Sequence, residues 1–215
     1  MFIGHFALGF AAKRAVPRVS LATLFAAATF ADLLWPLLVA AGVEQVRIVP
    51  GITVMTPFDF VSYPYSHSLL MLVVWGVLFG WISARVVPGR RVFGIVFGLV
   101  VSHWLLDYMT HRPDMPLYPG GSKFGLSLWN YPTGEHVIEI AMYVIGAWIY
   151  SRATRARDGV GRWGLLSLAV LLLILFLANS APPPSVTALW VVSLAGGTLT
   201  LVWSYWADRH REAHD

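Results

Sequence analysis

The feature that most constrains this chain is a series of long apolar runs, at residues 20–42, 67–87, 92–110, 136–151, 163–180 and 186–207. A helix needs roughly 20 apolar residues to cross about 30 Å of hydrocarbon, so each run is close to the length of a membrane span. Helices also satisfy their own backbone hydrogen bonds in lipid. We therefore predict an all-α, polytopic membrane helix bundle with six spanning helices, forming one integral membrane domain over residues 1–215.

The composition agrees with a membrane class and excludes several others. Hydrophobic residues make up 57% of the chain and charged residues only 12%, against about 25% charged residues in soluble domains. No cysteine is present, which excludes disulfides, thiolate metal ligands and a cysteine nucleophile. The net charge of +4 does not indicate nucleic-acid binding, because the basic residues lie in short gaps between apolar runs.

A shorter apolar segment, residues 1–16, precedes these runs and stops at Pro17. Proline disfavours continuation of a helix, and no positive charge precedes the apolar part as it would in a signal peptide. We predict a retained short N-terminal helix.

Topology follows from the basic residues, since cytoplasmic loops are enriched in Lys and Arg. Twelve of the 15 Lys and Arg residues lie before the first run, after the second and fourth runs, and in the C-terminal segment. The other three are Arg47, Arg112 and Lys123. This alternation predicts outward-facing loops at 43–66 and 111–135 and a charged cytoplasmic tail at 208–215.

Ionisable side chains inside a bilayer are costly and are therefore functional candidates. This chain places several in or beside its apolar runs: His5, Asp32, His67, His103, Asp107, His111, Glu135, His136 and Glu139. At a rise of 1.5 Å per residue, Asp32 and His103 lie roughly 21 and 18 Å from the cytoplasmic ends of their helices. We expect these groups to converge in the outer third of the membrane.

His103 and Asp107 are four residues apart, which places them on one helical face. Together with Asp32, His67 and His5 they make a nitrogen and oxygen ligand set suited to a divalent metal, with Zn²⁺ favoured. His136 with Glu139 is a candidate for a second ion, and His111 is a looser candidate. A proton relay or a structural ion pair is the alternative for Asp32, His103 and Asp107.

Other polar residues have simpler interpretations. We expect the Glu135 carboxylate to cap the N-terminus of the fourth span, where the positive end of the helix dipole favours a negative charge. We expect Ser66 to cap the second span rather than to act as a nucleophile. Arg112 and Lys123 are candidates either for holding an anionic substrate or for anchoring to lipid headgroups.

The ordered motifs resemble a known family. His5, Ala31-Asp32-Leu33, the segment Tyr65-Ser66-His67-Ser68, and Ser102-His103 followed by Asp107 are similar, over about residues 1–120, to the YdjM-like family of bacterial inner-membrane proteins. The resemblance implies a metal-dependent hydrolase, remotely similar to zinc-dependent phospholipases C, with metal-ligand roles for His5, Asp32, His67, His103 and Asp107. Leu34 stands where the family usually has a second acidic residue.

These observations favour a membrane-embedded metal-dependent hydrolase with one or two divalent ions. The expected substrate is a phosphoester of a lipid or lipid-linked molecule in the outer leaflet of the bacterial inner membrane. Asp32, Asp107 and Glu139 are the candidate catalytic residues. The alternatives are a metal or proton-coupled transporter that uses the same cluster, and a catalytically inactive scaffold. A carrier would need ionisable groups in the cytoplasmic half as well, and the sequence shows none there outside the loops.

Overall fold

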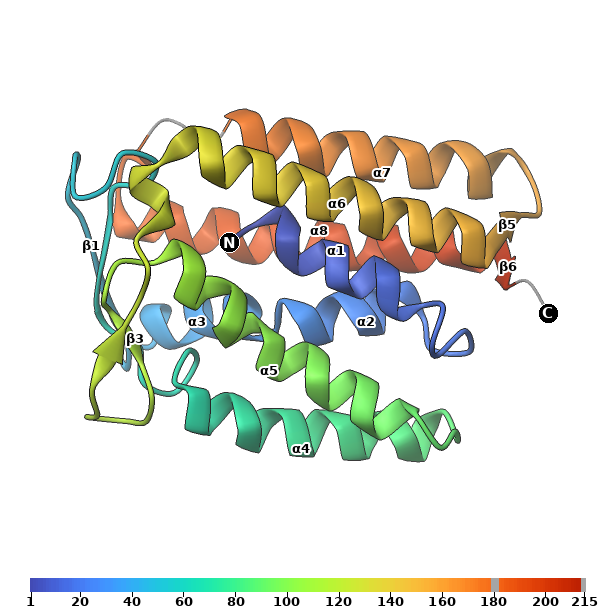
Figure 1. Cartoon of the computed structure of the whole chain (residues 1–215), viewed down its shortest axis with the longest axis horizontal. Coiled ribbons are helices and arrows are strands. Elements are labelled where there is room, and N and C mark those ends of the chain that lie inside the picture. Colours follow the sequence, from blue (N-terminus) through green and yellow to red (C-terminus); the bar gives the residue numbers. More distant parts are fainter. Residues whose placement is uncertain (179–181, 214–215) are drawn as a thin grey trace.

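The computed structural model describes residues 1–178 and 182–213, and 64% of the chain is helical. The α-helices of the described part are α1 (Ile3–Ala12), α2 (Leu21–Ala28), α3 (Phe30–Ala40), α4 (Leu69–Val86), α5 (Val92–Thr110), α6 (Pro132–Ala153), α7 (Gly159–Ala178) and α8 (Val186–Arg209). They run along one axis, with α7 and α6 at the top of Figure 1, α5 and α4 at the bottom, and α1 between α6 and α2.

In the described part of the chain, short strands and a 3-10 helix lie at the ends of the bundle. The strand pairs are β1 (Gln45–Ile48) with β2 (Phe58–Ser62), β3 (Met115–Pro116) with β4 (Lys123–Phe124), and β5 (Thr154–Ala156) with β6 (Arg211–Ala213), all antiparallel. The 3-10 helix η1 (Leu128–Asn130) precedes α6. The segments at 43–66 and 111–135, which the sequence predicts as loops on one side of the membrane, contain two hairpins at the same end of the bundle (Figure 1).

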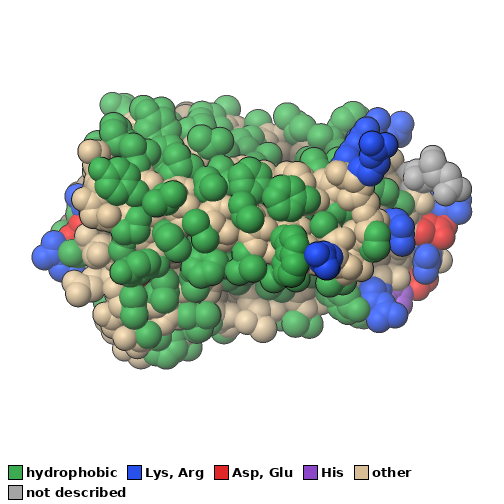
Figure 2. Space-filling view, turned by 90° about the horizontal axis from the view of Figure 1, so that it is seen from below, with side chains coloured by type: hydrophobic (Ala, Val, Ile, Leu, Met, Phe, Trp, Pro, Cys, Tyr) green, Lys and Arg blue, Asp and Glu red, His purple; other side chains and the backbone are tan. Residues whose placement is uncertain are grey.

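Four described helices, α4, α5, α7 and α8, are long and apolar enough to cross a membrane, and α2 with α3 makes a fifth span if the bent pair counts as one. The expectation of six spans is not confirmed. The other long helix, α6, has 22 residues, but Glu135, His136 and Glu139 in its first turns lower its hydropathy. Figure 2 shows a surface that is largely apolar along its length, with basic side chains concentrated at one end.

The predicted first span, 20–42, is broken into α2 and α3, which meet at an angle of 61°. Thr29 lies between them with a non-helical backbone (φ −106°, ψ 19°), and its hydroxyl donates to the carbonyl of Phe25 at 2.8 Å. The break places Asp32 in the first turn of α3, where the positive end of the helix dipole favours a carboxylate.

The short helix α1 lies in the interior, with His5, Phe6 and Phe10 buried. It packs against α6, α2 and α5. A Cβ atom at Gly146 of α6 would lie 2.3 Å from the carbonyl oxygen of Ala7, so only glycine permits this approach. The predicted N-terminal helix is confirmed, although it ends at Ala12 rather than near residue 16.

The end of the bundle opposite β1 and β3 contains a buried ion pair. Lys13 Nζ lies 2.7 Å from Asp208 Oδ2, and Asp208 also accepts from Tyr150 Oη at 2.6 Å and from the Leu21 amide at 3.0 Å. Asp208 belongs to the last turn of α8 and is buried, so it is not part of a charged tail. Residues 211–213 form β6, and the predicted tail's last residues, including His214, lie outside the described part.

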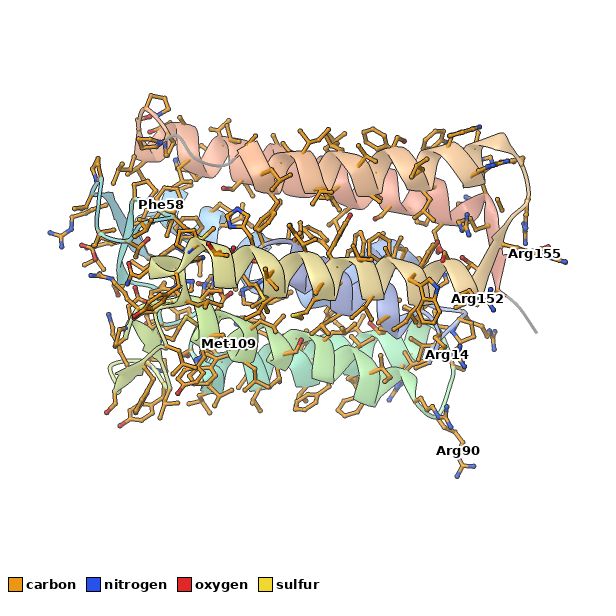
Figure 3. The ribbon with its side chains drawn as sticks, turned by 45° about the horizontal axis from the view of Figure 1, so that its top comes forward. Arg14, Phe58, Arg90, Met109, Arg152 and Arg155 are labelled. Carbon is orange, nitrogen blue, oxygen red and sulfur yellow. The ribbon has the colours of Figure 1, made fainter. Side chains whose placement is uncertain are left out.

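The basic residues mark that same end. Figure 3 labels Arg14, Arg90, Arg152 and Arg155, all of which lie at the end away from Phe58 and the β1–β2 hairpin. The clustering agrees with the uneven distribution of Lys and Arg along the sequence.

Candidate metal centre

Asp107 of α5 lies at the centre of a cluster of histidines. Its Oδ2 atom is 3.1 Å from His103 Nε2, 3.7 Å from His111 Nε2 and 3.9 Å from His67 Nε2. His103, Asp107 and His111 are spaced by four residues, so the helical period alone aligns them along one face. His67 comes from the turn before α4 and reaches the cluster only through packing.

Asp32 lies on the other side of the two central histidines. Its Oδ1 atom is 3.6 Å from His67 Nε2 and 3.7 Å from His103 Nε2. The Asp32 side chain is 46% exposed, whereas those of His67, His103 and Asp107 are 3% exposed or less. The exposed side of the cluster therefore lies at Asp32.

The amino-terminal segment completes the buried side of the cluster. His5 Nε2 lies 3.0 Å from Asp107 Oδ1, and the His5 ring stacks on the His103 ring with centroids 3.9 Å apart. The Met1 amine also contacts Asp107 Oδ1, at 2.6 Å, and donates to Thr110 at 3.0 Å. Residues of α1, α3 and α5, and of the turn before α4, thus converge as predicted for these segments.

Three of these histidines have the Nδ1 atom engaged by an acceptor outside the cluster. His103 Nδ1 donates to the Ala28 carbonyl at 2.9 Å, and His111 Nδ1 donates to Asp114 at 3.0 Å. His67 Nδ1 lies 2.7 Å from Ser66 Oγ. A neutral histidine that donates through Nδ1 has a lone pair on Nε2, which is the arrangement found around protein-bound metals.

The donor set fits a divalent metal ion. Among the described residues, His103 Nε2 is buried and makes no hydrogen bond of acceptable geometry, although Asp107 Oδ2 lies 3.1 Å and Asp32 Oδ1 3.7 Å from it. A buried nitrogen that faces two carboxylates without a hydrogen bond is a candidate ligand atom. Two overlapping groups have ligand atoms within 4.8 Å of one another: His5, His103 and Asp107, and Asp32, His67 and His103. Imidazole nitrogens with carboxylate oxygens suit Zn²⁺ and other first-row metals.

The predicted second pair, His136 and Glu139, lies outside this cluster. His136 Nδ1 donates to the Pro132 carbonyl at 2.6 Å, and its ring packs against Phe176. Glu139 accepts from the amides of Phe2 and Gly4, at distances between 2.9 and 3.0 Å. Its carboxylate therefore caps the start of α1, where unpaired amides and the helix dipole favour a negative charge.

Glu135 is 1% exposed, and its Oε2 atom is 3.7 Å from His136 Nδ1. It lies in the first turn of α6, and its role at the positive end of the helix dipole stays a prediction.

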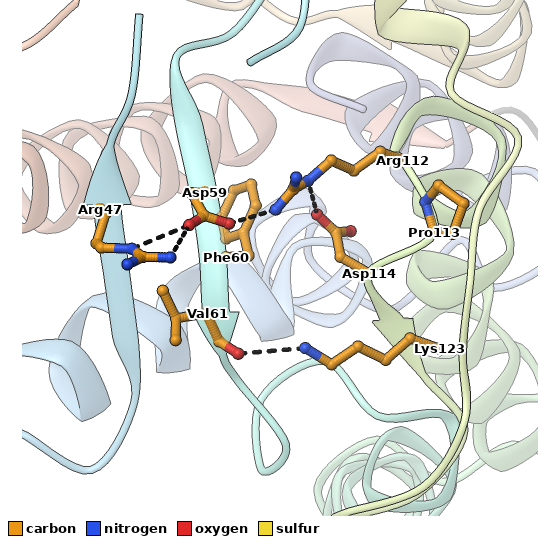
Figure 4. A pocket seen from close by; sticks show the side chains of 8 residues that line it. All are labelled: Arg47, Asp59, Phe60, Val61, Arg112, Pro113, Asp114 and Lys123. Carbon is orange, nitrogen blue, oxygen red and sulfur yellow. Dashed lines mark hydrogen bonds and ion pairs between the residues drawn. The ribbon is translucent and has the colours of Figure 1, made fainter.

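The predicted substrate residues Arg112 and Lys123 line one hollow of about 360 Å³ near the β1–β2 hairpin (Figure 4). Arg47 lines it as well, and both arginines bind Asp59 from opposite sides. Arg112 also donates to Asp114 Oδ2 at 3.1 Å. Asp114 Oδ1 also accepts from His111 Nδ1 at 3.0 Å, and His111 Nε2 lies 3.7 Å from Asp107 Oδ2. A chain of contacts thus joins the hollow to Asp107.

Buried groups around Asp114 have perturbed acidities. Burial favours the neutral form of Asp114, but hydrogen bonds from His111, Tyr63 and Arg112 outweigh it and hold the pKa below its ordinary value. Burial, reinforced by the charge of Asp114, raises the pKa of Tyr63 well above its ordinary value. Tyr63 therefore stays a hydrogen-bond donor to Asp114, at 2.9 Å.

Sequence reasoning did not single out Glu44 or Asp114, because both lie in loops without a periodic pattern. The prediction that Ser66 caps the second span is wrong. Ser68 is the N-cap of α4 and accepts from the Met71 amide, whereas Ser66 donates to Glu44. No local motif reveals this contact, since it joins residues 22 positions apart along the sequence.

A polytopic helical membrane protein with a His/Asp cluster able to hold a metal ion is the class that this fold and site define. The chain matches the profile described as YdjM inner membrane protein over residues 1–181, and it belongs to that family. The match extends beyond the resemblance expected over residues 1–120 and leaves α8 outside. No curated protein and no solved structure matches the chain.

Proposed function

We propose that this protein is a membrane-embedded, metal-dependent hydrolase that cleaves a phosphoester of a lipid or lipid-linked substrate. The observation that carries the proposal is the buried Nε2 atom of His103, which faces both Asp107 Oδ2 at 3.1 Å and Asp32 Oδ1 at 3.7 Å. The motif resemblance to metal-dependent hydrolases, and remotely to zinc-dependent phospholipases C, supports the same conclusion.

His67, His103 and Asp107 would hold the ion, with Asp32 and His5 at opposite sides of the cluster. When bound, Zn²⁺ in such a site lowers the pKa of coordinated water to about 7 and neutralises charge on a phosphoryl oxygen. Asp32 has the most exposed side chain of the cluster. We therefore assign it the role of general base, which accepts a proton from the attacking water. The role proposed for Glu139 from sequence is reassigned to holding α1, because its carboxylate accepts from two backbone amides.

Substrate binding is assigned to the hollow lined by Arg47, Arg112 and Lys123. Arginine and lysine recognise phosphate through charge-assisted hydrogen bonds. The hollow lies at the end of the bundle that has β1 and β3, opposite the cluster of arginines. Since basic ends face the cytoplasm, we assign the site to the outer leaflet and the C-terminus to the cytoplasm.

The direct test measures metal content in protein purified in detergent. We expect stoichiometric metal, and a loss of about 100-fold or more in affinity for His103→Ala and Asp107→Ala. His136→Ala is the matched control, because His136 lies outside the cluster, and it should retain the metal. Unchanged metal content in both cluster variants would contradict the site.

Activity is tested on vesicles of phosphatidylglycerol and phosphatidylcholine, with release of phosphorylated headgroups followed by ³¹P NMR. Hydrolysis should stop with a chelator and return with Zn²⁺. Arg112→Ala should raise KM more than it lowers kcat, because it removes a substrate contact and leaves the cluster histidines in place. A protein that binds metal but hydrolyses no phosphoester would refute the hydrolase assignment.

A transporter is the second candidate, and one observation favours it. The buried pair Lys13–Asp208 supplies ionisable groups inside the other half of the bundle, where the sequence had placed such groups only in the loops and the tail. A carrier predicts metal uptake into proteoliposomes that contain a metal-sensitive dye, and loss of uptake in Asp208→Asn. Uptake without hydrolysis would select this function over the proposed one.

A further inference from the structure

Glu44 is a buried carboxylate in the loop between α3 and β1, and it contacts the segment that bears His67. The residue is 1% exposed. Its Oε1 atom accepts from the amides of Tyr65 at 2.8 Å and Ser66 at 2.9 Å. Its Oε2 atom accepts from the Ser66 hydroxyl at 2.6 Å. A buried carboxylate is costly unless donors surround it, and here three donors do.

The Ser66 hydroxyl has a second contact, with His67 Nδ1 at 2.7 Å. A hydroxyl has one proton to donate. Because an ionised carboxylate can only accept, Ser66 donates its proton to Glu44, and its lone pair must then accept from His67 Nδ1–H. In the neutral imidazole this chain of contacts leaves the lone pair of His67 on Nε2, the atom that lies 3.6 Å from Asp32 and 3.9 Å from Asp107.

We propose that Glu44 is a positioning residue that acts through Ser66 to fix the tautomer and ring orientation of His67 as a metal ligand. The inference rests on the metal site of the proposed function and does not depend on the reaction. Carboxylates that orient ligating histidines are known to tune metal affinity. Here a serine hydroxyl extends the reach of the carboxylate by one hydrogen bond.

A purely structural role for Ser66 is disfavoured by its neighbour. Ser68 already caps α4, accepting from the Met71 amide and donating to the Pro64 carbonyl at 2.6 Å. The two serines flank His67 and are both buried, but the Ser66 hydroxyl contacts His67 whereas the Ser68 hydroxyl contacts backbone groups. They are therefore a matched pair for substitution.

Substitutions of Ser66 and of Glu44 should change the hydrogen-bond chain from Glu44 through Ser66 to His67 in different ways. Ser66→Ala removes both hydroxyl contacts while Glu44 keeps its two amide donors. Ser66→Thr retains the hydroxyl. In Glu44→Gln an amide nitrogen facing Ser66 becomes a donor, so Ser66 must turn its own proton toward His67 Nδ1. That reversal moves the ring proton of His67 to Nε2 and blocks the ligand atom.

The experiment measures Zn²⁺ affinity by competition with a chromophoric chelator, using the full chain in detergent. We expect affinity 10- to 100-fold weaker in Ser66→Ala and Glu44→Gln, and recovery toward wild type in Ser66→Thr. Ser68→Ala should lower thermal stability and leave Zn²⁺ affinity unchanged. Wild-type affinity in both Ser66→Ala and Glu44→Gln would overturn the proposal, as would an equal loss of affinity in Ser68→Ala.

A second readout needs no metal. In ¹⁵N-histidine NMR of the metal-free protein, His67 should be the Nδ1–H tautomer in wild type and the Nε2–H tautomer in Glu44→Gln. An Nε2–H tautomer in wild type would overturn the proposal. The proposed function fails separately, if wild type binds Zn²⁺ through His67 but cleaves no phosphoester.

Discussion

His103 donates through Nδ1 to the carbonyl oxygen of Ala28, at 2.9 Å, where α2 ends. The last carbonyls of a helix have no partner within it. The break between α2 and α3 thus supplies an acceptor in the interior of the bundle, and the acceptor turns His103 Nε2 toward Asp32 and Asp107. A continuous helix over residues 20–42 would have used that carbonyl internally.

Metal binding should stabilise the folded chain through Asp107. A ligand at 100 times its Kd stabilises by about 2.7 kcal/mol. We expect Zn²⁺ to raise the thermal unfolding temperature of wild type in detergent and to have no effect on Asp107→Asn. Asp59→Asn, which removes a carboxylate from the β1–β2 hairpin, should still show the rise in unfolding temperature with Zn²⁺. A Zn²⁺ effect that survives in Asp107→Asn would place the ion elsewhere.

Gly146→Ala should destabilise the bundle by about 1–3 kcal/mol, the usual cost of overpacking. The new Cβ would lie 2.3 Å from the Ala7 carbonyl oxygen, so α1 must move. Because α1 bears His5, Zn²⁺ affinity should fall as well. Gly98→Ala is the control, since nothing among the described atoms lies within 4 Å of its Cβ. Equal unfolding temperatures for the two variants would contradict the close packing of α1 and α6.

Lys13→Met should destabilise the chain by about 3–5 kcal/mol, because it leaves the Asp208 carboxylate buried without its cation. Adding Asp208→Asn to Lys13→Met should recover part of the loss, and a double-mutant cycle of unfolding free energies measures the coupling. Arg14→Met, an exposed neighbour, should change stability by less than about 0.5 kcal/mol. Additive effects of the two substitutions would rule out the coupling.

Hydrogen bonding and charge from Arg155 lower the pKa of Glu212 below its ordinary value of 4.5. A carboxylate whose pKa is lower in the folded state stabilises that state when it is ionised. The ion pair therefore stabilises the β5–β6 hairpin above pH 4.5, and this contribution is lost as the pH falls through the lower pKa of the folded state. We expect a ¹³C carboxyl titration to show Arg155→Gln raising the pKa of Glu212 toward 4.5. Arg90→Gln, at the same end of the bundle but in another loop, should leave the titration unchanged. An identical titration in Arg155→Gln and wild type would contradict the ion pair.

Local periodicity determined much of this protein. The apolar runs predicted the positions of its long helices, and the spacing of His103, Asp107 and His111 predicted their common face, because both depend on residues within a few turns of each other. The motif order also indicated that Asp32, His67 and His5 would join them. What it could not show was the pairing of Lys13 with Asp208, the break at Thr29, or the reach of Glu44 to Ser66.

The two pairings, and the use that His103 makes of the break, depend on contacts between distant segments. Lys13 and Asp208 are 195 residues apart, and Ala28 and His103 are 75 residues apart. Packing decided which histidines keep a free lone pair and which carboxylates serve as helix caps, so His103 faces the cluster while Glu139 holds α1. The amino-acid sequence determined which side chains could be ligands, and the tertiary structure selected among them. The physical reason is that the acceptor which the fold brings to Nδ1 of an imidazole decides whether its Nε2 has a lone pair for a metal ion.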